Sequence, residues 1–334
     1  MKITKYNHLI PQNIATYDAT NIGVYNGRGK KLGGFGLQNL RLPTLGEKQY
    51  SFGALSDVHI TAETATTDLH EALRYLSNDS DALFACICGD LTDTGVETEF
   101  ATYKRIVDAY DIPVYAIAGN HEYYNTVSNA HLETYTGKPL YYSFTHGDDV
   151  FIMCGCYSWE SDGMFTNEYL QWLYETLEAN RNKRCFVFEH VFPWGDCGNP
   201  NNVYGSDLFS GTKGDIFLSM LKHYKNTILF HGHSHTKFVM QEDDEKANFS
   251  NAKGYRSIHI PSIAIPRDLV DGTLTQIFAQ SEGYLIDVYK NHIVLRGRDF
   301  VKKEFIPIAT YCIDTKLVEI EAGTYTDSTG IITT

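Results

Sequence analysis

The segment "ALFACICGDLTDTGVETEFATYKRIVDAY", residues 82–110, indicates the fold class most directly. It begins with a short apolar run typical of a buried strand and turns at Gly89-Asp90. It then continues with apolar residues at the three- and four-residue spacing of a helix. The same alternation of apolar runs and helical segments continues along the chain from about Tyr50. Strands and helices in alternation predict a layered α/β architecture with at least partly parallel sheets.

Six apolar runs are expected to form buried strands, because they are short and rich in β-branched or aromatic residues. The runs are "YSFGALS", "ALFACIC", "VYAIAG", "VFIMCG", "CFVFEH" and "TILFHG". Helices are expected over residues 68–77, 95–110 and 166–180, which lie between these runs. Later in the chain, residues 283–300 contain two strand-like halves, which predict a hairpin turning at positions 290–291.

Three parts of the chain differ in composition. Residues 1–48 are rich in glycine and contain Asn26-Gly27, a hairpin signal, between short apolar segments, so we expect a β-rich N-terminal arm. Residues 49–310 hold the α/β pattern and are expected to form one domain. Residues 311–334 end in a polar, Thr-rich stretch, and we expect them to be a peripheral C-terminal tail.

The charge balance and the lengths of the apolar runs limit the partners. With 28 Lys and Arg residues against 41 Asp and Glu residues, the net charge is −13. This charge argues against a broad nucleic-acid-binding surface but not against a small phosphorylated substrate. The first residues have no signal-peptide pattern and no run reaches transmembrane length, so we expect a cytoplasmic protein without a membrane partner.

Four of the seven cysteines stand at alternate positions inside apolar runs; they are Cys86, Cys88, Cys154 and Cys156. Alternate positions on a buried strand suit free thiols that pack as small hydrophobic groups, and such neighbours are badly placed to form a disulfide. We therefore expect a structural role for these cysteines.

Residues able to bind metal ions follow five of the six apolar runs. They are Asp57 and His59, Asp90 and Asp93, Asn120 with His121 and Glu122, Glu189 with His190, and His233 with His235. In open α/β sheets, the loops at the carboxyl ends of the strands converge on one crevice, so residues far apart in sequence can meet there. Carboxylate, imidazole and amide oxygen together suit two borderline divalent ions such as Mn, Fe, Zn or Co, whereas Ca or Mg alone would prefer oxygen ligands.

The ordered motifs "DVH", "GDLTD", "GNHE", a distant histidine at 190 and "GHSH" resemble the calcineurin-like metallophosphoesterase superfamily over roughly residues 50–300. The resemblance implies a four-layer αββα sandwich, in which two mixed β-sheets are flanked by helices. It also implies two divalent metal ions in the domain at 49–310. The implied ligands are Asp57, His59 and His235 for the first ion, Asn120, His190 and His233 for the second, and Asp90 as the bridge between them.

The same resemblance gives roles to two residues that are not ligands. His121 would lie beside the scissile phosphate, where it steadies the transition state or protonates the leaving oxygen. Asp93 would orient His121, with a simple turn residue as the alternative. The implied reaction is in-line attack on phosphorus by a hydroxide that bridges the two ions, without a phosphoenzyme.

Two details indicate the branch of the superfamily. His59 stands where purple acid phosphatases lack a histidine, and Asp93 where they carry a tyrosine ligand. The stretch "GDLTDTGVETEF" is similar to the cyclic-nucleotide phosphodiesterase-like branch, although many of those proteins have Asp where "GNHE" ends in Glu. We therefore expect hydrolysis of a small, nucleotide-like phosphodiester. The alternatives are a phosphomonoesterase or nucleotide pyrophosphatase, and a non-catalytic structural or attachment protein on the same fold.

Aromatic residues near the motifs are candidates for substrate binding. Trp194 and Tyr204 lie in the Gly- and Asn-rich segment 192–215, which also contains Phe209, and Tyr123 follows "GNHE". Their rings could stack on a flat leaving group or simply pack the loops against the core. Tyr124 and Trp159 carry the same two interpretations, and Arg267 is a candidate phosphate contact.

Three histidines alternate in "TILFHGHSHTKF", residues 227–238. A regular strand would point His231, His233 and His235 to one face. Because Gly232 interrupts the strand, the alternation need not continue, and the resemblance begins only at this glycine. We therefore expect His231 to pack the strand or support the ligands rather than bind a metal ion.

Overall fold

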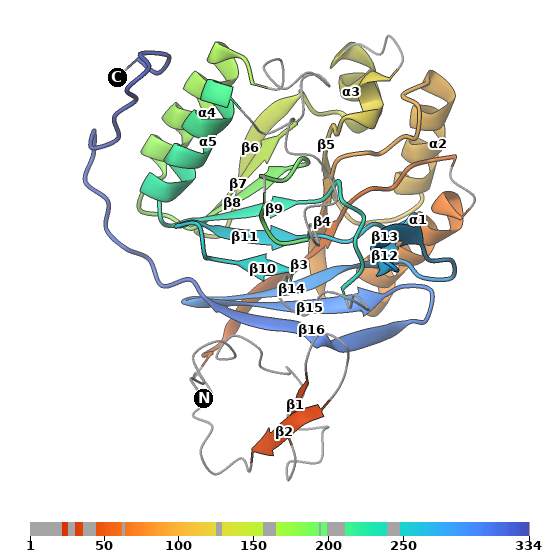
Figure 1. Ribbon diagram of the computed structural model, residues 1–334. Helices are drawn as coiled ribbons and strands as arrows, with labels where there is room; N and C mark the ends of the chain where they lie inside the picture. Colours follow the sequence, from red (N-terminus) through yellow and green to blue (C-terminus); the bar gives the residue numbers. More distant parts are fainter. Residues whose placement is uncertain are drawn as a thin grey trace.

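The computed structural model consists of two six-stranded sheets that pack face to face, with helices on both outer faces (Figure 1). This is the four-layer αββα sandwich of mixed sheets predicted from the sequence. The described residues are 22–25, 31–35, 45–61, 64–124, 129–155, 165–193, 195–198, 211–238 and 248–333. None of the described helices combines the length and the apolar character needed to cross a membrane.

The first sheet has the order β16-β15-β14-β3-β4-β5. Its strands are β3 (Lys48–Leu55), β4 (Ala82–Cys88), β5 (Val114–Ile117), β14 (Glu282–Tyr289), β15 (His292–Asp299) and β16 (Glu304–Asp314). The strands β3, β4 and β5 run parallel, and β14 to β16 are antiparallel, so the sheet is mixed. The hairpin between β14 and β15 confirms the turn predicted at positions 290–291.

Helices α1 (Ala65–Arg74) and α2 (Glu97–Val107) connect the parallel strands of the first sheet, and a π-helical turn at Tyr75–Asp79 follows α1. Their apolar faces pack on the outer side of β3 and β4. The buried contacts include Leu69 and Phe100 from the helices against Ile87 from the sheet. A short helix, α3 (Asn129–Thr136), lies beside α2.

The second sheet has the order β10-β11-β9-β8-β7-β6. Its strands are β6 (Tyr141–His146), β7 (Asp149–Cys154), β8 (Cys185–Glu189), β9 (Thr227–His231), β10 (Phe249–Ser250) and β11 (Arg256–His259). Helices α4 (Asn167–Ala179) and α5 (Gly211–His223) cover its outer face. The helix α4 begins where the hydroxyl of Thr166 accepts a hydrogen bond from the Tyr169 amide at 3.1 Å. Its apolar stripe of Leu170, Leu173 and Leu177 is fully buried. A separate hairpin joins β12 (Arg267–Val270) to β13 (Thr273–Gln276).

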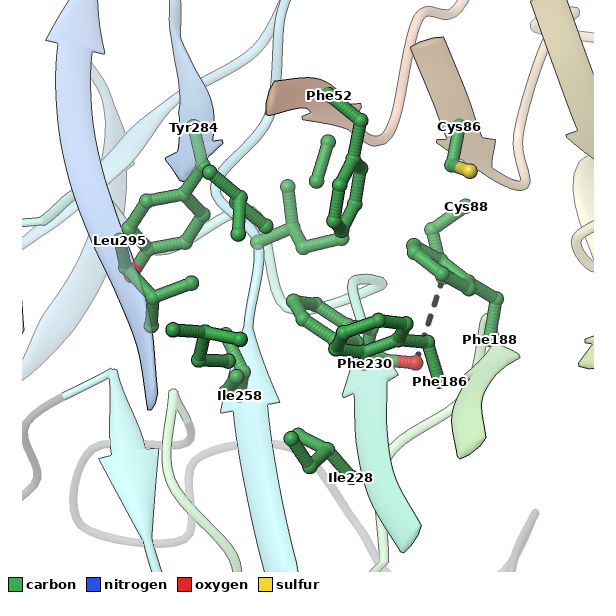
Figure 2. Packing of buried hydrophobic residues seen from close by; sticks show 14 of the residues in the cluster. Phe52, Cys86, Cys88, Phe186, Phe188, Ile228, Phe230, Ile258, Tyr284 and Leu295 are labelled. Carbon is green, nitrogen blue, oxygen red and sulfur yellow. Dashed lines mark hydrogen bonds between the residues drawn. The ribbon is translucent and has the colours of Figure 1, made fainter. Parts of the chain in front are cut away.

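Aromatic side chains fill the space between the two sheets (Figure 2). The ring centroids of Phe52 and Phe186, which come from opposite sheets, are 5.5 Å apart. Cys86 and Cys88 lie in this core as free, buried thiols, and Cys154 is free and buried on the other face of its sheet. The predicted structural role is confirmed for these three cysteines, and Cys156 lies outside the described residues.

Near the N-terminus two short strands pair with each other, whereas the C-terminal tail packs against the domain. The strands β1 (Ile22–Tyr25) and β2 (Lys31–Phe35) are antiparallel, and the residues of the predicted Asn26-Gly27 turn lie outside the described part. The strand β16 continues past position 310 to 314. The tail that follows is not peripheral, because Ile320, Tyr325 and Ile332 are buried in the core cluster beneath α4 and α5. The domain boundaries at 48 and 310 stay predictions.

Candidate metal centre

The carboxyl ends of β3, β4 and β5 meet those of β8 and β9 at one edge of the sandwich. Hydrogen bonds join the two sheets there, since the amide of His233, after β9, donates to both carboxylate oxygens of Asp57, after β3, at 3.1 Å. The amide of Gly232 donates to the carbonyl of His190 at 3.0 Å. The polar residues that follow the strands therefore come together in three overlapping groups, of which two share Asp90 and the third consists of His59, Asp93 and His121.

The first group consists of Asp57, His59, Asp90 and His235, whose candidate ligand atoms all lie within 4.8 Å of one another. The Nε2 atom of His235 is 3.1 Å from Asp57 Oδ1 and 3.1 Å from His59 Nε2. His59 Nε2 is also 3.5 Å from Asp90 Oδ2. All four residues are buried. The group contains the three residues expected around the first ion together with the expected bridge.

The second group consists of Asp90, His190 and His233, also within 4.8 Å of one another. His190 donates from Nδ1 to the carbonyl of Cys88 at 2.6 Å, which leaves Nε2 facing Asp90 Oδ2 at 3.1 Å. Asn120 follows Gly119, which packs directly against Asp90 and His190. Asp90 belongs to both groups, as a bridging carboxylate must.

The backbone is strained at five of the seven predicted ligands. Their φ angles are positive: 53° at Asp57, 46° at His59, 51° at Asp90, 68° at His233 and 60° at His235. Left-handed backbone costs a residue other than glycine about 1 kcal/mol or more, and such residues cluster at functional sites. The surrounding structure therefore holds these side chains in place against a local preference for other conformations.

The charges of the cluster are set by burial and by close histidine–carboxylate pairs. Burial opposes the charge on Asp90, but the neighbouring His190 holds the pKa of Asp90 well below its usual range. Burial also disfavours a charged His190, yet Asp90 and Asp57 outweigh it and raise the pKa of His190 to about 10. By contrast, burial lowers the pKa of His233 to about 3 and that of His235 to about 4, so both imidazoles are neutral and can donate lone pairs.

Several polar atoms in the cluster lack hydrogen bonds although they are buried. They are Asn120 Oδ1, and Asp90 Oδ2 and His190 Nε2, which face each other at 3.1 Å. Unsatisfied buried polar atoms are costly, and each of these atoms is a lone-pair donor or can become one. The residues present therefore fit two divalent cations, and their nitrogen and oxygen atoms suit Mn, Fe or Zn.

His121 and Asp93 lie beside the first group. The amide of His121 donates to Asp90 Oδ1 at 3.0 Å, and its Nδ1 donates to the main-chain oxygen of Asp93 at 2.6 Å. His121 Nε2 is therefore turned toward Asp90, 3.9 Å from Oδ2. The Asp93 carboxylate is 3.2 Å from His59 Nδ1 but 3.9 Å from His121 Nδ1. Asp93 thus contacts His121 through its backbone, while its side chain supports His59.

Glu122 has a role that its residue type did not reveal. It is buried, and its carboxylate accepts hydrogen bonds from the amide and hydroxyl of Thr92 at 2.8 Å and from the amide of Gly119 at 2.6 Å. Burial raises the pKa of Glu122 to about 7. Glu122 therefore ties the loop after β4 to the loop after β5. The signal in the sequence was its spacing, three residues after the glycine at the end of a strand.

The aromatic candidates and Arg267 are placed differently. Tyr123 packs against the core beneath α1 and α2, whereas Tyr124 contacts His121. The amide of Arg267 donates to the carbonyl of His235 at 2.7 Å, and its positive charge is close enough to favour neutral His235. The other candidates lie outside the described residues, and their roles stay predictions; they are Trp159, Trp194, Tyr204 and Phe209.

His231 belongs to a separate buried cluster with Asp196 and Cys197. Its Nε2 is 3.6 Å from Cys197 Sγ. Hydrogen bonds already satisfy Asp196, which accepts from the hydroxyl of Ser257 at 2.6 Å and from that of Tyr255 at 2.7 Å. This cluster therefore works as a hydrogen-bond network that fixes the loop after β8 to β9 and β11.

The two-sheet sandwich and its paired Asp/His groups define the metallophosphoesterase class of protein. The chain belongs to the calcineurin-like phosphoesterase family, whose model matches residues 50–237, more than half of the chain. By class it is a phosphoric ester hydrolase, which confirms the expectation from the sequence.

Relatives agree with this assignment. A protein named probable cyclic nucleotide phosphodiesterase from Ruthia magnifica subsp. Calyptogena magnifica is 26% identical over 226 residues, which cover 65% of this chain and 87% of that protein. Two solved structures share the fold at 14% identity. Purple acid phosphatase PPD1 from yellow lupin (Lupinus luteus) seeds has a TM-score of 0.53 over 81% of this chain and 55% of its own length. GAP50, the anchor in the inner membrane complex of Plasmodium, has a TM-score of 0.54 over 85% of this chain and 93% of its own.

Proposed function

We propose that the protein is a dinuclear metal-dependent phosphohydrolase that acts on a small phosphodiester. The observation that carries this proposal is the pair of adjoining Asp/His groups that share Asp90. The similarity to a probable cyclic nucleotide phosphodiesterase from Ruthia magnifica supports a nucleotide-like diester as the substrate.

The ligand roles follow the two groups. Asp57, His59 and His235 would hold the first ion, and Asn120, His190 and His233 the second, with Asp90 binding both. Two divalent ions supply Lewis acidity that polarises a phosphoryl oxygen and activates water near neutral pH. Mn, Fe and Zn all suit these ligands.

His121 is the proposed general acid. Because its Nδ1 donates to the Asp93 carbonyl, its Nε2 is the atom that can carry a proton toward the reacting phosphate. In the in-line displacement, the oxygen of water forms a new bond to phosphorus as the bond between phosphorus and the leaving oxygen breaks, and the leaving oxygen takes the proton from His121 Nε2. The hydrogen bond from the His121 amide to Asp90 holds the imidazole next to the bridging carboxylate. A well-placed acid contributes about 10²–10⁴-fold.

Elemental analysis and a substrate panel test the proposal together. The protein is purified from metal-replete medium without chelator, and hydrolysis of bis-p-nitrophenyl phosphate, p-nitrophenyl phosphate and 3′,5′-cyclic AMP is measured. We expect two ions per chain and faster turnover of the diesters. Fewer than one ion per chain would refute the dinuclear proposal. Faster turnover of p-nitrophenyl phosphate would favour a phosphomonoesterase, and a metal-free, inactive protein would favour a structural or attachment role.

A further inference from the structure

Tyr124 contacts two neighbouring residues of the proposed site, the acid His121 and the second-ion ligand Asn120. Its ring centroid is 4.3 Å from that of His121, with the planes tilted by 51°. Its hydroxyl accepts a long hydrogen bond, 3.5 Å, from Asn120 Nδ2. Tyr124 follows the short 3₁₀ helix η4 (His121–Tyr123), so one rigid turn sets all three side chains.

Exposure separates Tyr124 from the residues that it contacts. Its side chain is 47% exposed, whereas Asn120 is buried and the side chain of His121 is 22% exposed. The ring therefore stands at the boundary between the buried ligand groups and solvent. A partly exposed aromatic ring beside the ligand groups is suited to contact a flat, uncharged group.

We propose that Tyr124 is a specificity-determining residue that packs against an aromatic group of the substrate, such as the base of a nucleotide. This inference rests on the proposed function. The substrate oxygen that His121 protonates carries the leaving group, so that group lies on the His121 side of the phosphate. The Tyr124 ring packs against the imidazole of His121, with 4.3 Å between the ring centroids, and is therefore close to that group. Aromatic stacking on a base is strong but tolerant of base identity, which suits selection of a class of ester rather than one nucleotide.

A matched pair of ligands isolates the contribution of the aromatic group. AMP and ribose 5-phosphate have the same phosphate and sugar, and only AMP has a base. Their affinities are measured by calorimetry on the metal-loaded wild type, on Tyr124→Leu and on Tyr124→Phe. Tyr110→Leu is the control, because Tyr110 also contacts a histidine: its hydroxyl is 3.0 Å from His70 Nδ1. His70 lies on α1 and Tyr110 just after α2, and neither belongs to the candidate metal groups.

We expect Tyr124→Leu to weaken AMP binding about tenfold or more and to leave ribose 5-phosphate binding unchanged. Tyr124→Phe and Tyr110→Leu should keep the preference for AMP. An equal effect of Tyr124→Leu on both ligands, or no effect on AMP, would overturn the inference and leave the proposed function standing. If the metal-loaded wild type bound AMP no more tightly than ribose 5-phosphate, the inference would also be overturned, whereas the proposed function is decided by metal content and diester turnover.

Discussion

Gly119 has no room for a side chain at the point where Asp90 and His190 meet. A Cβ atom built on Gly119 would lie 2.2 Å from Asp90 Oδ1, 2.5 Å from the Asp90 amide nitrogen and 2.8 Å from His190 Cδ2. Ordinary van der Waals contact begins at 3.4 Å, so Gly119→Ala requires a shift of about 1 Å. One of the blocking atoms belongs to the backbone, and the other two belong to side chains held by hydrogen bonds. The added methyl group must therefore displace the proposed bridging carboxylate.

This displacement should affect activity more than folding. Overpacking of this kind costs about 1–3 kcal/mol of stability, and misplacement of a reacting group by about 1 Å can cost about 10²-fold in rate. We expect Gly119→Ala to remain folded, to hold fewer than two ions per chain, and to lose about 10²-fold in kcat/KM for bis-p-nitrophenyl phosphate.

The control for this substitution is Gly137→Ala. Gly137 has a φ of +67° and open space around its Cβ position, so alanine there costs about 1 kcal/mol of backbone strain without touching the site. Elemental analysis, diester hydrolysis and thermal unfolding are measured on both variants. A folded Gly119→Ala protein with two ions per chain and wild-type turnover would refute the reasoning, because it would mean that Asp90 is not confined as described.

Three further comparisons address other assignments. His121→Ala should lower kcat by about 10²–10⁴-fold with metal content unchanged, and unchanged turnover would exclude its role as acid. His233→Asn should deplete metal and activity together in elemental analysis and assays, whereas His231→Asn should keep most of both; equal losses would contradict the separation of the two clusters. Burial raises the pKa of Glu282 from 4.5 to about 7, so the wild type loses stability as pH rises through this window. Glu282→Gln, which can still accept from the Phe238 amide, should match the wild type at pH 4 in urea unfolding and exceed it by up to about 3 kcal/mol at pH 8; a constant difference would show that Glu282 does not titrate there.

The elements with strong local signals could be predicted from the sequence. All six apolar runs are strands, and the three helices lie where the apolar spacing places them. The tail could not be predicted, because its polar composition hides Ile320, Tyr325 and Ile332. Their burial depends on contacts with α4 and α5, such as the 2.7 Å hydrogen bond between the hydroxyls of Tyr325 and Ser219. Such contacts join parts of the chain more than 100 residues apart, and no local pattern encodes them.

The membership of the site could be anticipated more fully than its geometry. Residue types and their order at strand ends indicated which side chains would meet, since parallel strands bring their carboxyl ends to one edge. The left-handed backbone at Asp57, His59 and Asp90 could not be predicted, because aspartate and histidine adopt it at only a minority of positions and no local pattern marks which. Gly232 follows the last residue of β9, so it interrupts the strand as expected, but the structure also leaves no room for a side chain there. A Cβ atom on Gly232 would lie 1.9 Å from Ser56 Oγ. That glycine is required by close packing between the two sheets.

The contacts of Asp93 show why a motif can place a residue correctly and still leave its action undetermined. Asp93 stands next to His121 as expected, but the 2.6 Å contact comes from its main-chain oxygen, which every residue possesses. Its carboxylate instead accepts from His59 Nδ1, and the nearby His59 lowers the pKa of Asp93. The carboxylate is therefore needed to orient a proposed metal ligand, whereas the orientation of His121 depends on the path of the loop. That path is fixed by Glu122 through Thr92 and Gly119, so the residue that holds the proposed acid in place is the glutamate of "GNHE".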